Sequence, residues 1–315
     1  MYFSFLSRIN NTASPLPKPI KSRLIQVVRN RFLKCVFYFK TNKPFVSGDS
    51  ISSVTDYYVY GRNSKKKLNM KKLLASGSIS VPGHLFQNLL DELSSLPNLR
   101  TIVTCNSDEN FTTPIKLPKQ IKLWLCQNNA ISNDARIHTL PIGIENIRLV
   151  RSGFPNIHRP QSRFEIEDKI LVPPMALSNV VRSKVLYELK QRNSNFDIKL
   201  DYLSTKDYFT LTRKYRFILA LEGNGFENHR IWEALYQNSF PVLLRSEWAL
   251  TLSELNLPIM YINSVSEVTS TSLNDFLSKH KDFLASKHEA LWIPYWKEII
   301  ETGVFRNPNS GYLIH

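Results

Sequence analysis

Acidic residues are missing from the beginning of this chain. Its first 48 residues contain no Asp or Glu but nine Lys or Arg, and as far as Lys72 fifteen basic residues stand against two acidic ones, Asp49 and Asp56. That stretch accounts for +13 of the formal net charge of +15, so the rest of the 315 residues is nearly neutral. A protein that binds nucleic acid over a whole surface would spread its basic residues more evenly. The asymmetry predicts that one end of the chain meets an anionic partner.

Cysteines and long apolar runs are also scarce. The three cysteines, Cys35, Cys105 and Cys126, are odd in number and form no CxxC pair, which argues against a disulfide framework or a structural zinc site. No apolar run reaches the roughly 18 residues of a membrane-spanning helix, and the short apolar stretch 1–9 does not have the form of a secretory signal. We therefore expect a cytoplasmic protein whose thiols stay reduced.

Apolar material, in contrast, is plentiful. Hydrophobic residues make up 43% of the chain, enough for the cores of two domains. The predicted strands are 43–49, 101–105, 122–126, 137–140, 169–172, 196–203, 216–221, 241–244 and 259–262. The predicted helices are 84–95, 179–192, one that begins at 205, and 273–285. Strands that alternate with helices indicate mostly parallel sheets.

A polar stretch without periodicity, residues 151–166, divides the chain and is typical of a linker. The predicted fold class is therefore α/β, with two facing Rossmann-like domains and a cleft between them. We place a basic N-terminal segment at 1–42, an N-terminal α/β domain at 43–155 and a C-terminal α/β domain at 165–315.

The most informative segment is 216–244, which predicts a strand, a loop, a helix and a second strand. Gly223 and Gly225 flank Asn224 in the loop and allow its backbone to approach a ligand closely. Asn228 is well placed as the N-cap of the helix that follows. Because unpaired N–H groups and the helix dipole then lie at the carboxyl end of a parallel strand, this arrangement indicates an anion site.

Three polar residues share one face of that helix. His229, Arg230 and Glu233 are separated by three and four positions. Arg230 offers a planar fork that suits phosphate oxygens, and His229 is placed to donate a hydrogen bond to the same group. Glu233, one turn later, is able to accept from two adjacent sugar hydroxyls. The plainer alternative is a surface pair of Arg230 and Glu233 that contributes only tenths of a kcal/mol, with an incidental histidine.

The order of residues in this segment also matches a known pattern. The matching residues are Phe217, Leu219, Ala220, Glu222, Gly223, Gly225, Arg230, Glu233, Ala234, Leu235, Pro241 and Val242. They resemble the donor-binding signature of exostosin-like glycosyltransferases, which have the two-domain GT-B architecture, and they are similar to the donor-binding pattern of α-1,3-fucosyltransferases. The resemblance implies that Arg230 contacts the donor diphosphate and Glu233 the nucleotide ribose, in a donor site at 222–233. The Pro-Arg-Gly that often precedes the loop is replaced here by Leu221-Glu222-Gly223.

The chemistry of transfer needs charge stabilisation and, for inversion, a base. No Asp-x-Asp occurs in the chain, so we expect no metal and no cofactor besides the nucleotide-sugar substrate, with the leaving diphosphate met by basic side chains and helix N–H groups. An inverting enzyme would use a carboxylate or histidine to deprotonate the acceptor hydroxyl. The candidates are Asp49 first, Glu145 second and Glu222 third. A retaining enzyme needs no such base, and both mechanisms stay open.

The resemblance further implies a division of labour between the two domains. The domain at 165–315 would bind the nucleotide sugar, and the domain at 43–155 would bind a glycan or lipid-linked acceptor. Residues 18–43 have the pattern of a basic, moderately amphipathic helix, which would either lie on an anionic membrane surface or pack on the domain as an ordinary helix. These features predict a glycosyltransferase of bacterial surface polysaccharide synthesis, cytoplasmic and peripheral at the inner membrane face.

Two other classes of protein stay open. One is a non-catalytic protein that keeps a degenerate transferase fold, against which the intact His229, Arg230 and Glu233 argue. The other is a basic nucleic-acid-binding or modifying protein, which the net charge favours but the nearly neutral second half does not. We expect no nucleic-acid partner. A P-loop enzyme is disfavoured because the chain has no Gly-x-x-x-x-Gly-Lys-Ser/Thr.

Overall fold

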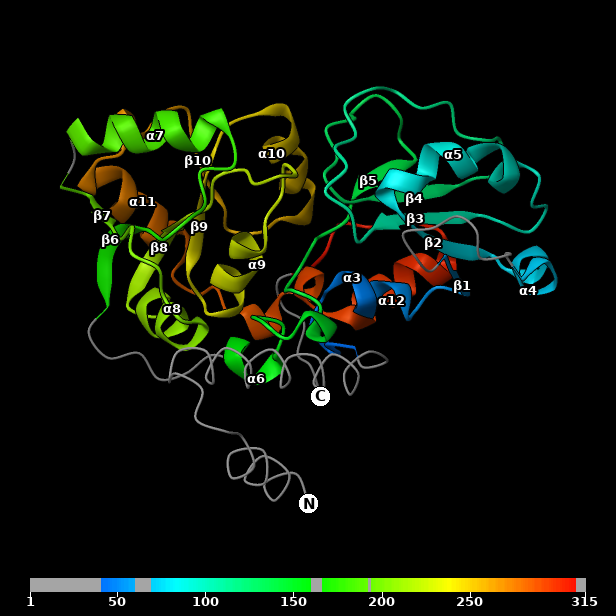
Figure 1. Ribbon diagram of the computed structural model, residues 1–315, viewed down its shortest axis with the longest axis horizontal. Helices are drawn as coiled ribbons and strands as arrows, with labels where there is room; N and C mark the ends of the chain where they lie inside the picture. Colours follow the sequence, from blue (N-terminus) through cyan, green and yellow to red (C-terminus); the bar gives the residue numbers. More distant parts are fainter. Residues whose placement is uncertain (1–40, 60–68, 160–165, 192–193, 310–315) are drawn as a thin grey trace, which may run out of the picture.

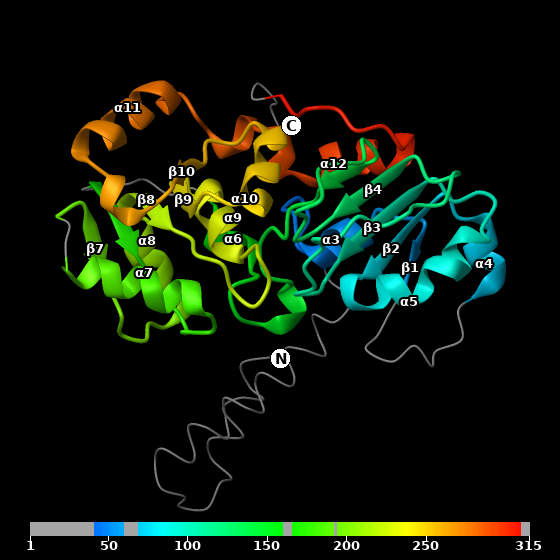
Figure 2. The ribbon, with the colours of Figure 1, turned by 90° about the horizontal axis from the view of Figure 1, so that it is seen from above.

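The computed structural model describes residues 41–59, 69–159, 166–191 and 194–309. Two five-stranded sheets, both with parallel strand pairs throughout, lie in the N-terminal and C-terminal halves of the chain. Helices pack on both faces of each sheet (Figures 1 and 2). The predicted α/β class with two parallel sheets is thus confirmed. The predicted basic segment 1–42 lies outside the described residues except for its last two.

The N-terminal sheet follows the chain order β1-β2-β3-β4-β5. Its strands are β1 (Tyr57–Tyr58), β2 (Ser78–Pro82), β3 (Thr101–Cys105), β4 (Leu123–Cys126) and β5 (Ile137–Thr139). Its helices are α3 (Gly48–Ser52), α4 (Met70–Ala75) and α5 (Gly83–Ser94), whereas the short α6 (Pro155–His158) contacts Phe209 and Arg213 of the C-terminal half. Figure 1 shows α5 on one face of the sheet and α3 on the other. Because both faces are covered, every residue of the three central strands is buried.

The C-terminal sheet has the order β7-β6-β8-β9-β10. Its strands are β6 (Glu167–Val172), β7 (Phe196–Ile198), β8 (Tyr215–Leu219), β9 (Phe240–Leu244) and β10 (Met260–Ile262). Its helices are α7 (Val180–Gln191), α8 (Thr205–Thr212), α9 (His229–Tyr236), α10 (Glu247–Thr251) and α11 (Ser270–His280). The chain runs outward from β6 to β7 and then back past β6 to β8. At such a reversal, open α/β sheets bind ligands outside the carboxyl ends of the two strands.

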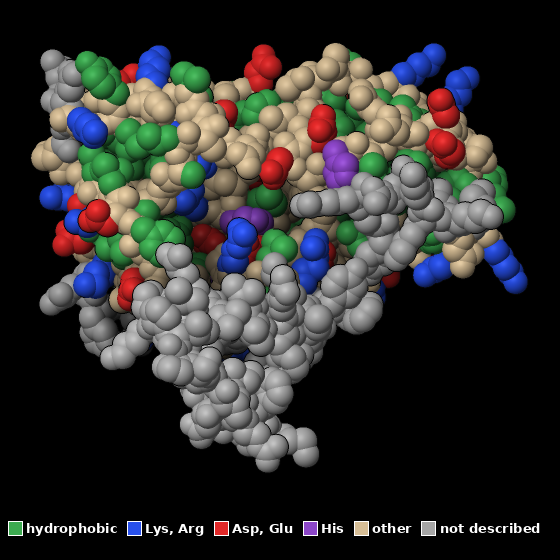
Figure 3. All heavy atoms as spheres, in the orientation of Figure 1, with side chains coloured by type: hydrophobic (Ala, Val, Ile, Leu, Met, Phe, Trp, Pro, Cys, Tyr) green, Lys and Arg blue, Asp and Glu red, His purple; other side chains and the backbone are tan. Residues whose placement is uncertain are grey.

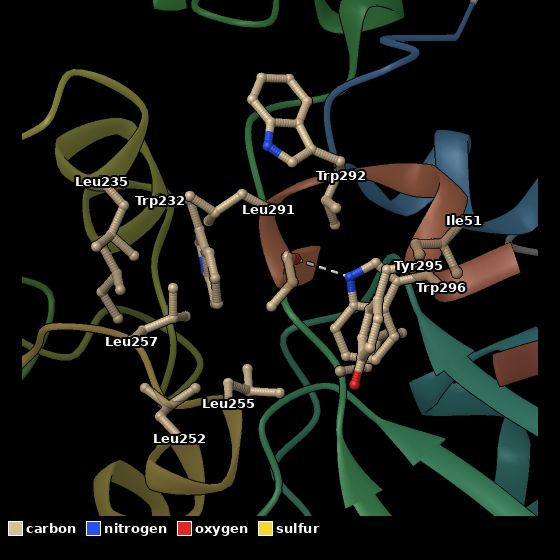
Figure 4. Close-up of a cluster of buried hydrophobic side chains, with 14 of the residues drawn as sticks. Ile51, Trp232, Leu235, Leu252, Leu255, Leu257, Leu291, Trp292, Tyr295 and Trp296 are labelled. Atoms are coloured by element: carbon tan, nitrogen blue, oxygen red, sulfur yellow. Dashed lines mark hydrogen bonds between the residues drawn. The ribbon is translucent and has the colours of Figure 1, made fainter. Parts of the chain in front are cut away.

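One apolar core joins the two halves. The last helix, α12 (Ile293–Thr302), returns to the N-terminal half, where the Thr101 hydroxyl donates to the carbonyl of Ile300 at 3.2 Å. Figure 4 shows side chains of α9 and of the segment 252–257 together with those of α3, α12 and the residues just before α12. The labelled members are Ile51, Trp232, Leu235, Leu252, Leu255, Leu257, Leu291, Trp292, Tyr295 and Trp296.

Most of the predicted elements are confirmed. Strands β3, β4, β5, β6, β8, β9 and β10 and helices α5 and α7 begin and end within two residues of their predicted bounds. Helix α8 begins at 205 as predicted, with Ser204 as its N-cap. The strand predicted at 196–203 is shorter, ending at Ile198, and the helix predicted at 273–285 lies at Ser270–His280.

The strand predicted at 43–49 is wrong. Ser47 is the N-cap of α3 instead, and Asp49 lies in the first turn of that helix rather than at the end of a strand. Phe45 and Val46, whose apolar character suggested a strand, are buried in the core between the halves. Apolar runs of this length do not distinguish a strand from any other buried segment.

The predicted linker at 151–166 contains short α6, whose His158 is fully buried. Residues 160–165 of this stretch lie outside the described residues. The boundaries at 43–155 and 165–315 stay a prediction, and α12 is a part of the second range that packs on the first.

Candidate functional site

The carboxyl ends of the N-terminal strands face the loop that follows β8. Asn106, Asn128 and Gly143 come just after β3, β4 and β5, and all three have positive φ angles of 57°, 53° and 65°. The Asn128 amide oxygen accepts from the N–H of Glu227 at 2.8 Å, and the Gly143 carbonyl lies 2.8 Å from Nδ1 of His229. On the face seen in Figure 3 the surface is hollowed where the halves meet, and basic, acidic and histidine side chains gather there.

Helix α9 begins as predicted. The side chain of Asn228 accepts from the N–H of Arg230 at 3.0 Å, and its amide nitrogen donates to the carbonyl of Leu221 at 2.8 Å. The cap therefore ties the helix to the end of the preceding strand. Its first turn is presented at the carboxyl edge of the C-terminal sheet, as an anion site requires.

Arg230 reaches across to the loop that follows β6. Its Nη2 donates to the carbonyl of Pro174 at 2.7 Å, while its Nε is buried and has no hydrogen-bond partner among the described residues. The side chain thus lies at the reversal between β6 and β8, where a ligand crevice is expected.

Arg182, in the first turn of α7, is a site residue that the sequence analysis missed. The N–H of Arg182 donates to the capping side chain of Asn179, and its guanidinium donates to the carbonyls of Ala176 at 2.7 Å and Leu221 at 3.3 Å. Its Nε is buried without a partner in the described part of the chain. Burial, and then the charge of Arg230, lower the pKa of Arg182, so the two guanidinium groups lie within electrostatic reach.

The guanidinium groups of Arg182 and Arg230, the arginine pair, are held by backbone carbonyls. No Asp or Glu in the described ranges forms a salt bridge with either of them. Each belongs to the first turn of an Asn-capped helix, one after β6 and one after β8. Two positive charges that are held together next to two helix N-termini favour the binding of an anion.

Glu233 is turned inward. It is only 5% exposed, and one of its oxygens accepts from the hydroxyl of Tyr208 at 3.3 Å. Burial, followed by the charge of Glu233, raises the pKa of that tyrosine, which stays a neutral donor. Arg230 interacts with the same hydroxyl, so Tyr208 joins the two residues that the helix pattern placed on one face.

Glu145 lies beside His229. One carboxylate oxygen accepts from the N–H of Ser152 at 2.9 Å, and the other is 3.9 Å from the guanidinium of Arg151. Burial raises the pKa of Glu145, and the charges of His229 and Arg151 oppose that shift. Of the three predicted base candidates, Glu145 is the one that the structure brings next to α9.

The other two base candidates have partners of their own. Asp49 forms a salt bridge of 2.6 Å with Arg148 and also accepts from the amide of Asn106 at 3.3 Å. Glu222 accepts from the indole N–H of Trp248 at 2.5 Å. Both carboxylates are thereby oriented, Asp49 toward the N-terminal half and Glu222 toward α10.

The glycine loop connects the halves. The N–H of Gly223 donates to the carbonyl of Gly225 at 2.9 Å, and Asn224 between them is exposed. A Cβ on Gly225 would lie 2.9 Å from the amide of Asn128, so glycine is needed there for close packing against the N-terminal half. A Cβ on Gly223 would lie 3.3 Å from Arg182, beside the arginine pair.

Two general properties complete the description of the site. In the described ranges no three His, Cys, Asp or Glu side chains come together as a metal site, and none of the helices there is long and apolar enough to cross a membrane. No model of a known protein family and no curated protein sequence matches the chain. The geometry of the site is therefore the basis for inferring a function.

Proposed function

We propose that this chain is a metal-independent glycosyltransferase of the two-domain GT-B type. In this proposal it moves a sugar from a nucleotide-sugar donor to a glycan or lipid-linked acceptor. The observation that carries the proposal is the arginine pair, which lies without a carboxylate partner among the described residues at the reversal between β6 and β8. A nucleoside diphosphate supplies the negative charge that this position lacks.

The arginine pair would stabilise the diphosphate both in the bound donor and as the leaving group. When the bond between sugar and diphosphate breaks, negative charge develops on the diphosphate oxygen, and preorganised donors stabilise it without a metal ion. Arg182 and Arg230 are already held by the carbonyls of Ala176 and Pro174. Little reorganisation is then needed during the reaction. The resemblance in sequence implies Glu233 as the ribose contact, but that carboxylate is only 5% exposed and accepts from Tyr208, so it is better placed to orient Tyr208 than to bind a ribose.

The N-terminal half offers groups of the kind that bind sugar hydroxyls. The carboxyl edge of its sheet carries the partly exposed amide of Asn106, which donates to Asp49 and accepts from Asn146, whereas the amides of Asn128 and Asn146 are buried. The hollow between the halves would be the cleft in which acceptor and donor meet. This assigns the acceptor to the N-terminal half and the donor to the C-terminal half, as the sequence analysis expects.

Nucleotide binding tests the proposal directly. Wild-type protein in EDTA is expected to be thermally stabilised by one member of the series UDP, GDP, CMP and their sugars. Arg230→Gln and Arg182→Gln should each weaken that binding by about 10- to 100-fold, because a charge-assisted hydrogen bond contributes about 1.5–3 kcal/mol. Arg216→Gln is the matched control, since Arg216 lies on β8 and forms a salt bridge with Asp168. Absence of stabilisation by every nucleotide, or equal binding by all variants, would reject the proposed donor site.

The basic beginning of the chain suggests where the enzyme works. Residues 18–43, nearly all outside the described residues, would hold it on an anionic membrane surface near a lipid-linked glycan at the inner face of a bacterial membrane. Deletion of residues 1–40 is expected to abolish sedimentation with anionic lipid vesicles, while neutral vesicles bind neither form. Equal sedimentation of the full chain and the deletion variant would refute this part of the proposal.

A further inference from the structure

The imidazole of His229 is oriented by a carbonyl of the opposite half. Its Nδ1 lies 2.8 Å from the carbonyl oxygen of Gly143. Because a carbonyl oxygen only accepts hydrogen bonds, Nδ1 carries the proton in this contact. In a neutral imidazole the other nitrogen is then unprotonated. Nε2 of His229 therefore keeps its lone pair and is able to take up a proton.

The carbonyl that orients this ring is itself fixed by its neighbours. A Cβ on Gly143 would lie only 2.1 Å from the carbonyl oxygen of Val46, so the two segments touch backbone to backbone. The N–H of Ile144 donates to that same oxygen at 2.9 Å. His229 is the first residue of α9, which is buried from residue 231 onward. Both partners of the contact are thus held by the main chain, which preorganises the imidazole.

Two titratable groups from other elements lie within electrostatic reach of His229. Glu145, from the loop after β5, interacts with the ring and also with Glu233 of α9 itself. His158 of α6 also faces it, but burial lowers the pKa of His158, which is therefore neutral near pH 7. Arg151, close to Glu145, is largely exposed to solvent. An imidazolium formed at His229 would thus face the buried carboxyl group of Glu145.

From this geometry we propose that His229 is the general base of the transfer, an inference that rests on the proposed function. Its Nε2 takes the proton of the acceptor hydroxyl while the hydroxyl oxygen forms a bond to the anomeric carbon of the donor. The bond from that carbon to the diphosphate breaks, and its electron pair leaves with the nucleoside diphosphate toward the arginine pair. The step is a single displacement with inversion, and the imidazolium then passes its proton to water.

This role differs from the diphosphate contact that the sequence predicts for His229. With its Nδ1 proton committed to Gly143, the ring donates from Nε2 only in its charged form. A phosphate contact would therefore weaken as the pH rises through about 5–8, the range in which histidines change charge, whereas a base would gain activity over that range. The side chains also diverge, because His229 points to Gly143 and its neighbour Arg230 to Pro174.

Hydrolysis of the donor, with water as the acceptor, provides a test that needs no knowledge of the natural acceptor. The probe is the UDP, GDP or CMP sugar that stabilises the full-length wild type most, and the readout is release of the nucleotide between pH 5 and 8. His229→Asn keeps an N–H donor for Gly143 but has no basic nitrogen. We expect its rate at saturating donor to fall about 10²- to 10⁴-fold and to lose its rise with pH. Nucleotide affinity should stay within about twofold of wild type.

His280→Asn, in the last turn of α11, serves as the matched control and should change neither quantity. The base assignment is overturned if His229→Asn hydrolyses bound donor at the wild-type rate, if it mainly weakens nucleotide binding by about tenfold or more, or if NMR shows that the sugar is released with retained configuration. Binding of a donor by the wild type without any release of nucleotide overturns it too. A wild type that binds no nucleotide sugar overturns the proposed function itself, and that result differs from all the others.

Discussion

Replacing Gly143 with alanine is expected to destabilise the protein by roughly 2–5 kcal/mol. The residue has a φ of +65°, a left-handed conformation that costs a residue with a Cβ about 1–2 kcal/mol. The new Cβ would also lie 2.1 Å from the carbonyl oxygen of Val46, a backbone atom that cannot rotate away. Overpacking of this kind costs about 1–3 kcal/mol more. Urea unfolding followed by circular dichroism measures the change in the free energy of unfolding.

Two other glycines separate these contributions. Gly303 has the same φ of +65°, but its Cβ would meet nothing closer than the Thr101 hydroxyl at 3.3 Å, so Gly303→Ala should show little beyond the conformational cost. Gly77 has an ordinary φ and a nearest neighbour at 3.5 Å, so Gly77→Ala should be nearly neutral. Equal losses for Gly143→Ala and Gly303→Ala would mean that the backbone contact with Val46 relaxes easily.

The same contact shows where sequence reasoning stops. Gly143 comes shortly after the predicted strand 137–140, and nothing in the pattern says that Val46 packs against it from almost 100 residues away. The apolar Phe45 and Val46 predicted a strand, yet they belong to the core between the halves, and Asp49 became part of a helix. Local patterns report burial well, but they do not report which element buries a residue.

The segment 216–244 was predictable because its signals are local. An apolar strand, an Asn cap and a helix that starts at His229 require only neighbouring residues, and the structure has all three. Arg182 was missed for the opposite reason. The sequence predicts a helix over 179–192, but not that its first turn belongs to the candidate site. That turn lies at the site only because β6 and β8 are adjacent and β7 lies outside them. Strand order depends on tertiary packing, and it places Arg182 beside Arg230.

The residue contacts between the two halves could not be predicted from the sequence either. Asp49 ranked first as the base because of its expected position at a strand end, whereas the structure pairs it with Arg148. Glu145 and His229 are more than 80 residues apart, and only the meeting of the two sheet edges brings them together. The helix position of His229 predicted a phosphate contact, whereas in the structure its Nδ1 faces the carbonyl of Gly143 across the junction of the halves.

The second large effect is expected from Glu227, a buried carboxyl group at the junction of the halves. One of its oxygens accepts from the N–H of Ile142 at 2.8 Å and from the indole N–H of Trp232. In the described part of the chain no Lys or Arg forms a salt bridge with it. Burial raises the pKa of Glu227 to about 8, and the hydrogen bonds from Ile142, Trp232 and Asn128 only partly oppose that shift.

The sign of the resulting pH dependence follows from which state holds the proton. In the unfolded chain the carboxyl has its ordinary pKa of 4.5, whereas the folded protein keeps the proton until the pH approaches 8. Between these values the folded state binds more protons, so the free energy of unfolding falls as the pH rises, by about 1.4 kcal/mol per pH unit where the difference is complete. The contribution of Glu227 to stability is fully present below the pKa of the unfolded chain. It is lost as the pH rises through the pKa of the folded protein.

Glu227→Gln should remove this dependence, because the amide keeps an acceptor oxygen for Ile142 and Trp232 but carries no charge at any pH. Urea unfolding at pH 5, 6, 7 and 8 measures the free energy of unfolding of both proteins. Between pH 5 and 8 we expect this free energy to fall by a few kcal/mol more in the wild type than in the variant, so that the variant is the more stable protein at pH 8. Other groups, such as Glu145, titrate in both proteins and cancel in the difference.

The control is Glu301→Gln, which changes an exposed partner of Lys297 and should leave the wild-type slope unchanged. Parallel curves for wild type and Glu227→Gln would show that this carboxyl is ionised in the folded protein, with the hydrogen bonds from Ile142 and Trp232 strong enough to hold its charge between the two halves.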